Sequence, residues 1–394
     1  MSLKILFCGD VCFKVQPEID REASKRILAP MRDILCAADL RVMNLECPLA
    51  PEGVGAPIYK SGPNIIGRPR NVGFLEAAGC DVAVLANNHI GDYGGDALTY
   101  TLGVLDEHSI PYVGAGENLD EAYSAYRIVR GGVSLSIVAV CENEFGIATS
   151  DRAGAAGFDL ERLGDKIEEE KEVSDYVIVV FHGGCEYNPL PSPLCRERYR
   201  TLVRLGADAV IAGHTHCMQG YEYYHDRPIV YSLGNFLFKW DKPTRPSWYH
   251  GYIAQLTIDA ESPRQLMIRP IPYVFDPDKN EISPLAGDKL EHTLRYIERI
   301  SLVIPDMDEL TRYYKGWCII SGLNYIKSLV AKPEYFEPSD TPPNIAPLKN
   351  LLCCEAHNEL MRTTLELIYN GELELARVWA GELEGLYYKE PSCN

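Results

Sequence analysis

Side chains able to do chemistry gather at the ends of predicted strands in this chain of 394 residues. Five apolar runs, each typical of a buried strand, are followed at once by polar residues. The polar groups are Asp10, Asn44 with Glu46, Asn87-Asn88-His89, His182, and His214 with His216. Because ligands of open α/β sheets bind just beyond the carboxyl ends of the strands, we expect these groups to meet in one crevice. Carboxylates, amide oxygens and imidazoles together suit Mn, Fe, Zn or another borderline divalent ion.

Each polar group taken alone also has a purely structural interpretation. Gly9-Asp10 is typical of a turn capped by its aspartate, and a single histidine after a strand, such as His182, is often a hydrogen-bonded structural imidazole. The run Gly213-His214-Thr215-His216 is more specific. Two imidazoles at i and i+2 of an extended segment point the same way, which predicts a bidentate grip on one metal ion. The coincidence of five such groups favours the functional interpretation.

The elements that must position these groups alternate in kind. Strands are predicted at residues 3–8, 40–43, 82–85, 134–141, 176–181 and 209–212. Helices are predicted at residues 18–38, 71–78, 96–108, 161–172 and 196–205. Three strand-like runs without helices between them follow at residues 228–233, 252–258 and 265–271. This order predicts an α/β domain that antiparallel strands extend into an α+β sandwich covered by helices.

The last quarter of the chain has a different predicted secondary structure. Helices alone are predicted there, at residues 290–304, 308–330, 345–369 and 373–388, with a proline-rich break at residues 333–347. We therefore expect two units. A domain over residues 1–280 carries the polar groups, and a helical C-terminal subdomain spans residues 281–394.

Composition limits the partners and the compartment. Thirty-eight Lys and Arg residues against 56 Asp and Glu residues give a net charge of −18, which repels nucleic acid and anionic membranes. Thirteen cysteines without a Cys-x-x-Cys pair are typical of thiols in a reducing compartment. The apolar run at residues 3–8 is too short for a signal peptide or a membrane span. We expect a cytoplasmic protein with no membrane anchor and no nucleic-acid partner.

In order and approximate spacing, the polar groups resemble those of bacterial capsule synthesis proteins of the CapA or PgsA type. The motifs that carry the resemblance are Gly9-Asp10, Asn44-Leu45-Glu46, Asn87-Asn88-His89, His182-Gly183-Gly184, Gly213-His214-Thr215-His216 and Ser232-Leu233-Gly234-Asn235-Phe236. Proteins of this type are associated with poly-γ-glutamate capsule formation, and their core is similar to that of calcineurin-like metallophosphoesterases. The resemblance covers residues 3–275 and implies a four-layer αββα core, with the helical subdomain outside it.

The resemblance also implies a ligand set for one or two divalent metal ions, which would be Mn, Fe, Zn or Mg. The first ion would take Asp10, Glu46 and His216. The second would take Glu46, Asn88, His182 and His214, so that Glu46 bridges the two. Such a pair lowers the pKa of a bridging water and shields the charge that grows on a phosphoryl group.

The remaining site residues would act on the substrate. His89 is the expected catalytic acid, because the ordinary pKa of histidine lies near neutrality and lets it protonate a leaving oxygen. The residues expected to contact substrate are Asn44, Lys60, Asn87 and Asn235. Lys60 belongs to a predicted loop at residues 48–69 and is a source of positive charge for an anionic substrate, with a solvated surface position as the alternative.

Two motifs depart from the phosphoesterase pattern. That pattern begins with Asp-x-His, whereas this chain has Cys12 at the third position, and its second motif is Gly-Asp, whereas this chain has Asn44-Leu45-Glu46. Cys12 is either a thiolate ligand or a packed free thiol. Capsule synthesis proteins share both substitutions, which favours that branch over a general phosphatase.

Two functions are compatible with these residues. The first is a metal-dependent hydrolase that acts on a phosphoester or an anionic polymer through metal-activated water. The second is a non-catalytic component that binds or assembles a polyanion with the help of its metal. Under both hypotheses the partner is an anionic small molecule or polymer.

Overall fold

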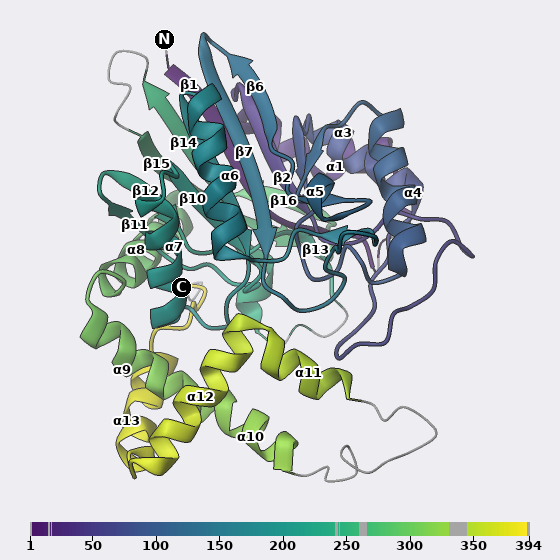
Figure 1. Ribbon diagram of the computed structural model, residues 1–394. Coiled ribbons are helices and arrows are strands. Elements are labelled where there is room, and N and C mark those ends of the chain that lie inside the picture. The colour runs from purple at the N-terminus through teal and green to yellow at the C-terminus, as the bar shows by residue number, and fades with distance from the viewer. Residues whose placement is uncertain are drawn as a thin grey trace, which may run out of the picture.

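The core of the protein is a pair of β-sheets in the computed structural model, which describes residues 2–14, 16, 18–240, 243, 245–259, 266–330 and 345–391 (Figure 1). The first sheet contains, in order, β16 (Glu281–Pro284), β15 (Leu266–Asp276), β14 (His250–Asp259), β1 (Ser2–Cys12), β2 (Leu40–Leu45), β3 (Val82–Val84) and β4 (Tyr112–Val113). An additional strand, β13 (Asn235–Phe238), pairs in parallel with the last residues of β1. The central strands β1, β2 and β3 run parallel to one another.

The second sheet contains, in order, β11 (Tyr221–Tyr224), β12 (Arg227–Val230), β10 (Ala209–Gly213), β9 (Tyr176–His182), β7 (Val133–Cys141) and β6 (Tyr126–Arg130). Strands β7, β9 and β10 are parallel, so their carboxyl ends share one edge. A small separate ribbon pairs β5 (Ala115–Gly116) with β8 (Gly154–Ala155).

Side chains that alternate along the strands of the second sheet pack on its two opposite faces. Val177 and Val179 of β9 belong to one apolar cluster, whereas Ile178 between them belongs to the cluster that contains the first sheet. Side chains of a strand point alternately to opposite faces, so Ile178 packs between the sheets and its neighbours pack outward. Both neighbours and Ile178 are fully buried, which explains why the strand reads as a continuous apolar run.

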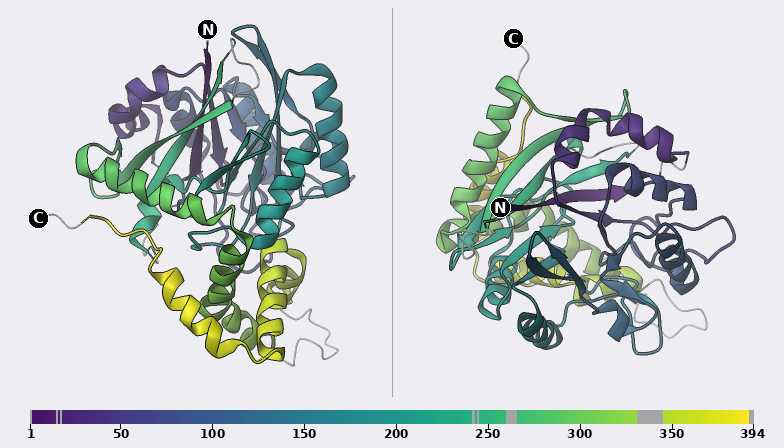
Figure 2. Two further views of the ribbon diagram at one scale, coloured as in Figure 1. Left: turned by 90° about the vertical axis from the view of Figure 1, so that its left-hand side faces the viewer. Right: turned by 90° about the horizontal axis from the view of Figure 1, so that it is seen from above.

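Helices cover both outer faces of the pair of sheets. The helices α1 (Arg21–Ile27), α3 (Val72–Ala78) and α4 (Gly94–Glu107) lie beside the first sheet, and α6 (Leu160–Val173) and α7 (Pro193–Arg204) lie beside the second (Figures 1 and 2). The order of layers is therefore helix, sheet, sheet, helix. The predicted α/β sandwich with four αββα layers is confirmed.

The predicted helix at residues 18–38 is interrupted. Helix α1 is followed by a 3-10 turn at Ala29–Met31 and by the short helix α2 (Arg32–Cys36). Pro30 lies in that turn, and its ring and missing N–H prevent a continuous α-helix. A further short helix, α5 (Leu119–Ala122), precedes β6.

The C-terminal part is helical, as predicted, but its helices are shorter. They are α8 (Gly287–Val303), α9 (Met307–Trp317), α10 (Leu323–Val330), α11 (Ala346–Cys353), α12 (Glu355–Tyr369) and α13 (Leu373–Glu384), and a π-helical turn at Cys318–Gly322 joins α9 to α10. The extended backbone of Cys354 separates α11 from α12. Most of the predicted break at 333–347 lies outside the described residues, and the division into units over 1–280 and 281–394 stays a prediction.

Helices α11 and α12 lie across the carboxyl ends of the strands (Figure 1). The Glu355 carboxylate accepts hydrogen bonds from the backbone and side chain of Asn143, at 2.9 and 2.6 Å, just after β7. The Glu359 carboxylate accepts a bond from the backbone of Leu194 in α7 at 3.0 Å. The tail therefore packs on the same edge where the polar groups lie. Within the described ranges, none of the helices combines the length and apolar character needed to cross a bilayer.

Candidate metal centre

The structure brings the five strand-end groups together in one buried cluster. The residues that share this burial are Asp10, Asn44, Glu46, Asn87, Asn88, His89, His182, His214 and His216, none more than 8% exposed. Parallel pairing aligns them, because Asp10 of β1 lies opposite Asn44 of β2 and Asn235 of β13. Gly213 at the end of β10 pairs with His182 of β9 in the same way.

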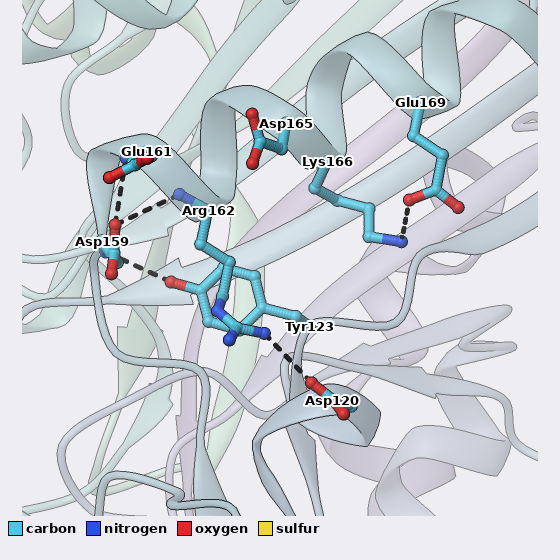
Figure 3. A pocket seen from close by; sticks show the side chains of 8 residues that line it. All are labelled: Asp120, Tyr123, Asp159, Glu161, Arg162, Asp165, Lys166 and Glu169. Atoms are coloured by element: carbon cyan, nitrogen blue, oxygen red, sulfur yellow. Dashed lines mark hydrogen bonds and ion pairs between the residues drawn. The ribbon is translucent and has the colours of Figure 1, made fainter.

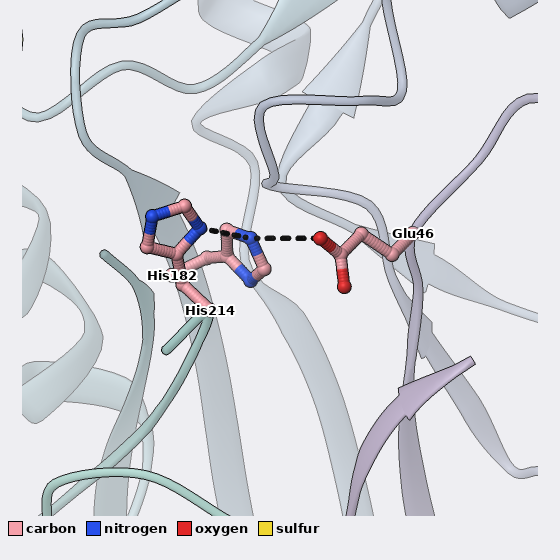
Figure 4. A group of neighbouring side chains, drawn as sticks. All are labelled: Glu46, His182 and His214. Carbon is pink, nitrogen blue, oxygen red and sulfur yellow. Dashed lines mark hydrogen bonds and ion pairs between the residues drawn. The ribbon is translucent and has the colours of Figure 1, made fainter. Parts of the chain in front are cut away.

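Glu46 lies at the centre of the cluster. Its Oε1 atom lies 3.6 Å from His182 Nε2 (Figure 4). The same atom is 3.9 Å from His216 Nε2, and the side chain is fully buried. In the part of the chain that the structure describes, no N–H group donates to either carboxylate oxygen. Burial, followed by the negative charge of Glu186, raises the pKa of Glu46 well above its usual range. An ionised carboxylate in this position requires a cation, so the site fits a divalent metal.

Two sets of candidate ligands share Glu46. The Glu46, His182 and His214 side chains offer ligand atoms within 4.8 Å of one another, and so do those of Asp10, Glu46 and His216. The Asn88 Oδ1 atom lies 3.2 Å from His182 Nε2 and thus borders the first of these sets. Mixed oxygen and nitrogen donors of this kind suit Zn, Mn or Fe.

The Asp10 carboxylate is held in place by donors on both of its oxygens. Oδ1 accepts a hydrogen bond from Asn44 Nδ2 at 2.7 Å, and Oδ2 accepts one from the backbone N–H of His214 at 3.3 Å. Burial and the nearby Glu46 charge raise the pKa of Asp10 to about 7. Asp10 Oδ2 also lies 3.7 Å from His216 Nδ1.

The prediction that His214 and His216 grip one metal ion from an extended segment is wrong. Their backbones have positive φ angles of 93° and 53°, and their ring centroids are 6.0 Å apart. The turn separates the two imidazoles, so that His214 joins the set of His182 and His216 joins the set of Asp10. A positive φ costs roughly 1–3 kcal/mol in a residue with a side chain and is often retained at functional sites.

The three imidazoles are poised to be neutral. Burial lowers the pKa of His182, lowers that of His214 well below its usual value, and lowers that of His216 to about 3. The neighbouring imidazole of His182 adds to the effect on His214. Neutral imidazole has the lone pair that a metal ligand needs.

Asn235 orients His216. Its Oδ1 atom is 2.9 Å from His216 Nδ1, and its Nδ2 donates to the backbone oxygen of Trp248 at 3.0 Å. Because an amide oxygen can only accept, the proton of His216 lies on Nδ1 and leaves Nε2 free toward Glu46. The Trp248 ring packs on the imidazole with centroids 4.7 Å apart.

Asn44 and Asn87 are also engaged within the cluster. Asn87 Nδ2 donates to Asn44 Oδ1 at 3.0 Å and to the backbone oxygen of Leu45 at 2.9 Å. Its Oδ1 accepts from the backbone N–H groups of His89 and Ile90 at 3.1 and 2.8 Å. These bonds fix the loop that follows β3. The predicted substrate contacts of Asn44, Asn87 and Asn235 stay predictions.

His89 lies in a buried network with Lys60 and Asp92. Its Nδ1 atom is 2.7 Å from Asp92 Oδ2 and 3.1 Å from the Lys60 ammonium, which also binds Asp92 Oδ1. The Lys60 side chain is 2% exposed, so the alternative of a solvated surface position is wrong. Burial lowers the pKa of His89 below its ordinary value, although Asp92 opposes the shift. The predicted contact of Lys60 with substrate stays a prediction.

Two acidic residues of the site were not predicted. Asp92 holds His89, and Glu144 Oε2 accepts a hydrogen bond from Asn88 Nδ2 at 2.6 Å. The sequence carries a signal for both. Glu144 follows a predicted strand closely, as the other groups do, and Asp92 comes three residues after His89.

Cys12 is a packed thiol. It is 1% exposed, and none of the candidate ligand groups found in the described part of the chain contains it. Burial, followed by a hydrogen bond with Cys47, raises its pKa well above the usual range. The packed-thiol alternative thus agrees with its surroundings.

A hollow lies on the surface near the start of α6 and has a volume of about 600 Å³ (Figure 3). Its charged side chains pair with one another, because Arg162 binds Asp120 at 3.1 Å and Lys166 binds Glu169 at 2.7 Å. Paired, exposed charges of this kind mark a solvated helix face. The candidate site therefore remains the buried cluster.

Comparison with known proteins identifies relatives of the sequence and of the fold. Residues 4–240 match the family described as bacterial capsule synthesis protein PGA_cap. The chain is 33% identical over 182 residues to the capsule biosynthesis protein CapA of Bacillus anthracis, with 43% of each chain covered. It is 30% identical over 245 residues to the PGA biosynthesis protein CapA of Bacillus subtilis, with 60% of this chain and 63% of that protein covered. The matches thus span less than two thirds of either relative.

Two crystal structures are among the structural matches of this chain. A novel phosphatase from Mycoplasma pneumoniae shares 16% identity at a TM-score of 0.44, with 71% of this chain and 96% of that one covered. A 5′-nucleotidase precursor from Thermus thermophilus shares 13% identity at a TM-score of 0.43, with 71% of this chain and 56% of that one covered.

Proposed function

The chain belongs to the family of bacterial capsule synthesis proteins, and we propose that it is a metal-dependent hydrolase of an anionic substrate in capsule polymer synthesis. The observation that carries this proposal is the state of Glu46. Its carboxylate is completely buried, accepts no hydrogen bond from an N–H group of the described residues, and is shared by two sets of metal-ligand side chains. Divalent cations between these sets would compensate its charge.

In the proposed arrangement two ions would share Glu46. Asp10 and His216 would help to hold one of them, and His182 and His214 would help to hold the other, with Asn88 beside them. When bound, such a pair supplies an activated water and positive charge for a phosphoryl or acyl oxygen. The substrate class is a phosphoester or an anionic polymer such as poly-γ-glutamate, since relatives carry the names of capsule and PGA biosynthesis proteins.

His89 is the residue proposed to move a proton. Its Nδ1 atom faces Asp92 Oδ2 at 2.7 Å, so its Nε2 atom is the one left for a substrate oxygen. The ammonium of Lys60 binds the other oxygen of Asp92 and thereby fixes the carboxylate that orients the imidazole. In this proposal Lys60 acts first as a positioning residue, and its contact with an anionic substrate is a second role.

A non-catalytic, metal-dependent polyanion-binding function is the alternative. This alternative is favoured by the surroundings of Cys12. Cys12 occupies the position at which the phosphoesterase pattern has a histidine. The set of Asp10, Glu46 and His216 consequently has three protein ligands, without a fourth from Cys12. A more weakly held first ion would still attract an anionic ligand and yet activate water poorly.

Turnover by the full chain distinguishes these functions. The protein is loaded with Mn²⁺, Zn²⁺, Fe²⁺ or Mg²⁺ and assayed on p-nitrophenyl phosphate, on bis(p-nitrophenyl) phosphate and on the chain length of poly-γ-glutamate. We expect His89→Gln to lower kcat by about 10²–10⁴-fold, the usual contribution of a general acid, while bound metal stays constant. His108→Gln, at a half-exposed histidine paired with Glu76 at 3.2 Å, is the matched control and should keep full activity.

Two results of this experiment would contradict the proposed function. Absence of turnover with every ion, together with metal-dependent binding of poly-γ-glutamate in calorimetry, would replace the hydrolase by the binding function. A rate that is equal in His89→Gln and wild type would remove His89 from the reaction.

For the compartment we propose the cytoplasm, because the twelve described cysteines are free thiols.

A further inference from the structure

A third group of metal-ligand side chains lies where the helical tail meets the core. Glu144, Cys354 and His357 offer ligand atoms that all lie within 4.8 Å of one another. Glu144 follows β7, whereas Cys354 immediately precedes α12 and His357 lies in its first turn. The group therefore joins two segments that are about two hundred residues apart, and it contains none of the ligands assigned to the two ions around Glu46.

The three side chains are directed toward one another in a buried place. Cys354 is 1% exposed, and the side chains of Glu144 and His357 are 7% and 19% exposed. The Nδ1 atom of His357 is inaccessible to solvent and has no hydrogen-bond partner among the described residues, while Glu144 Oε1 lies 3.8 Å from it. Cys354 is the residue immediately before α12, and His357 lies in the first turn of this helix.

The charge around the group is negative. The Cys354 thiol lies 3.5 Å from Glu142 Oε2. The Glu355 carboxylate binds the side chain of Asn143, the residue between Glu142 and Glu144 in the sequence. Arg198 compensates one of these carboxylates, since its Nη1 is 2.9 Å from Glu142 Oε1 and both side chains are buried. A divalent cation would compensate the rest.

We propose that Glu144, Cys354 and His357 bind a zinc ion that fastens α12 to the loop after β7. Sulfur, nitrogen and carboxylate oxygen are the donors of tetrahedral zinc sites, and a fourth ligand would complete the tetrahedron. On binding, the thiol proton is released to solvent and a zinc–sulfur bond forms. This site is separate from the proposed hydrolase centre and requires no turnover.

The zinc would also affect the neighbouring centre through one side chain. Glu144 uses its second oxygen to accept a hydrogen bond from Asn88 Nδ2 at 2.6 Å, while Asn88 Oδ1 faces His182 at 3.2 Å. Fixing Glu144 fixes the direction of the Asn88 amide. Outer partners of this kind typically change metal affinity by about 10–100-fold.

Cobalt absorption tests the proposed sulfur ligand directly. The full chain is stripped with chelator and refilled with Co²⁺, which reports a thiolate ligand by an intense charge-transfer band in the near ultraviolet. We expect this band in the wild type and in Asp10→Asn. We expect it to disappear in Cys354→Ser and to persist in Cys353→Ser, the matched control at the neighbouring exposed cysteine.

A second pair of variants keeps the test independent of folding. Glu144→Gln and His357→Gln retain the thiol and should weaken Co²⁺ binding at this band by about tenfold or more, with native circular dichroism. A wild-type protein without the band, or a band unchanged in Cys354→Ser, overturns the proposal. Loss of the band in Asp10→Asn alone would assign the sulfur signal to the other centre and overturn it too.

Discussion

Replacement of Asn235 by alanine tests how the metal centre is supported. The side chain makes one bond to His216 Nδ1 at 2.9 Å and one to the Trp248 backbone oxygen at 3.0 Å, and it is 2% exposed. Asn235→Ala removes the acceptor that holds the proton of His216 on Nδ1, so Nε2 is no longer the fixed metal-binding atom. The loss expected for such a partner is about 10–100-fold in metal affinity.

That loss corresponds to about 1.4–2.8 kcal/mol of binding free energy. Competition between the metal-free protein and a fluorescent chelator for Mn²⁺ measures it. A double-mutant cycle with His216→Ala isolates the contact, because Asn235→Ala should cost nothing further once the imidazole is absent. Asn71→Ala is the matched control, since Asn71 is equally buried and donates to the backbone of Ile19 at 2.8 Å.

Two results would refute this reasoning. If Asn235→Ala binds Mn²⁺ as tightly as Asn71→Ala does, the hydrogen bond to His216 does not support metal binding. If the full loss recurs in the His216→Ala background, the effect of Asn235 passes through another part of the site.

Three further predictions concern stability. Arg200→Met leaves the Glu222 side chain, which is 3% exposed, without its bidentate partner, and should lower the free energy of unfolding in urea by about 3–5 kcal/mol. Arg295→Met breaks an exposed ion pair and should lower this free energy by under about 1 kcal/mol. Equal losses in the two variants would contradict the prediction. Burial raises the pKa of Glu170, but hydrogen bonds, chiefly from Arg127, outweigh it and hold this pKa below the usual range. Glu170 therefore stabilises the fold above the ordinary glutamate pKa, and the stability difference from Glu170→Gln should shrink as pH falls below about 4.5; a constant difference would contradict it. Metal at a hundredfold excess over its Kd should add about 2.7 kcal/mol to the free energy of unfolding, so an unchanged Tm after chelation would count against bound metal.

The strand-end groups were predictable because parallel pairing fixes where the carboxyl ends of strands lie. Asp10, Glu46 and His182 each follow an apolar run, and the sheet registers bring those ends together. The direction of the side chains beyond the strands was not predictable. His214 and His216 show this, since their turn with positive φ replaces the alternation of an extended segment.

Other features depend on contacts between distant segments. The strand β13 is only four residues long, and its pairing with β1 is what brings Asn235 to His216. Lys60 looked like a loop cation, but its burial depends on Asp92, which lies 32 residues further along. The interruption of the helix at residues 18–38 was visible in Pro30, whereas the end of α11 at Cys354 has no comparable signal.

Anomalous diffraction from crystals grown with Mn²⁺ tests the central claim most directly. Data collected at the manganese absorption edge should give two peaks, both within ligand distance of the Glu46 carboxylate, one beside His216 and the other beside His182 and His214. Glu46→Gln should weaken both peaks. A map without a peak at Glu46, or with manganese bound only elsewhere, would contradict the proposed metal centre.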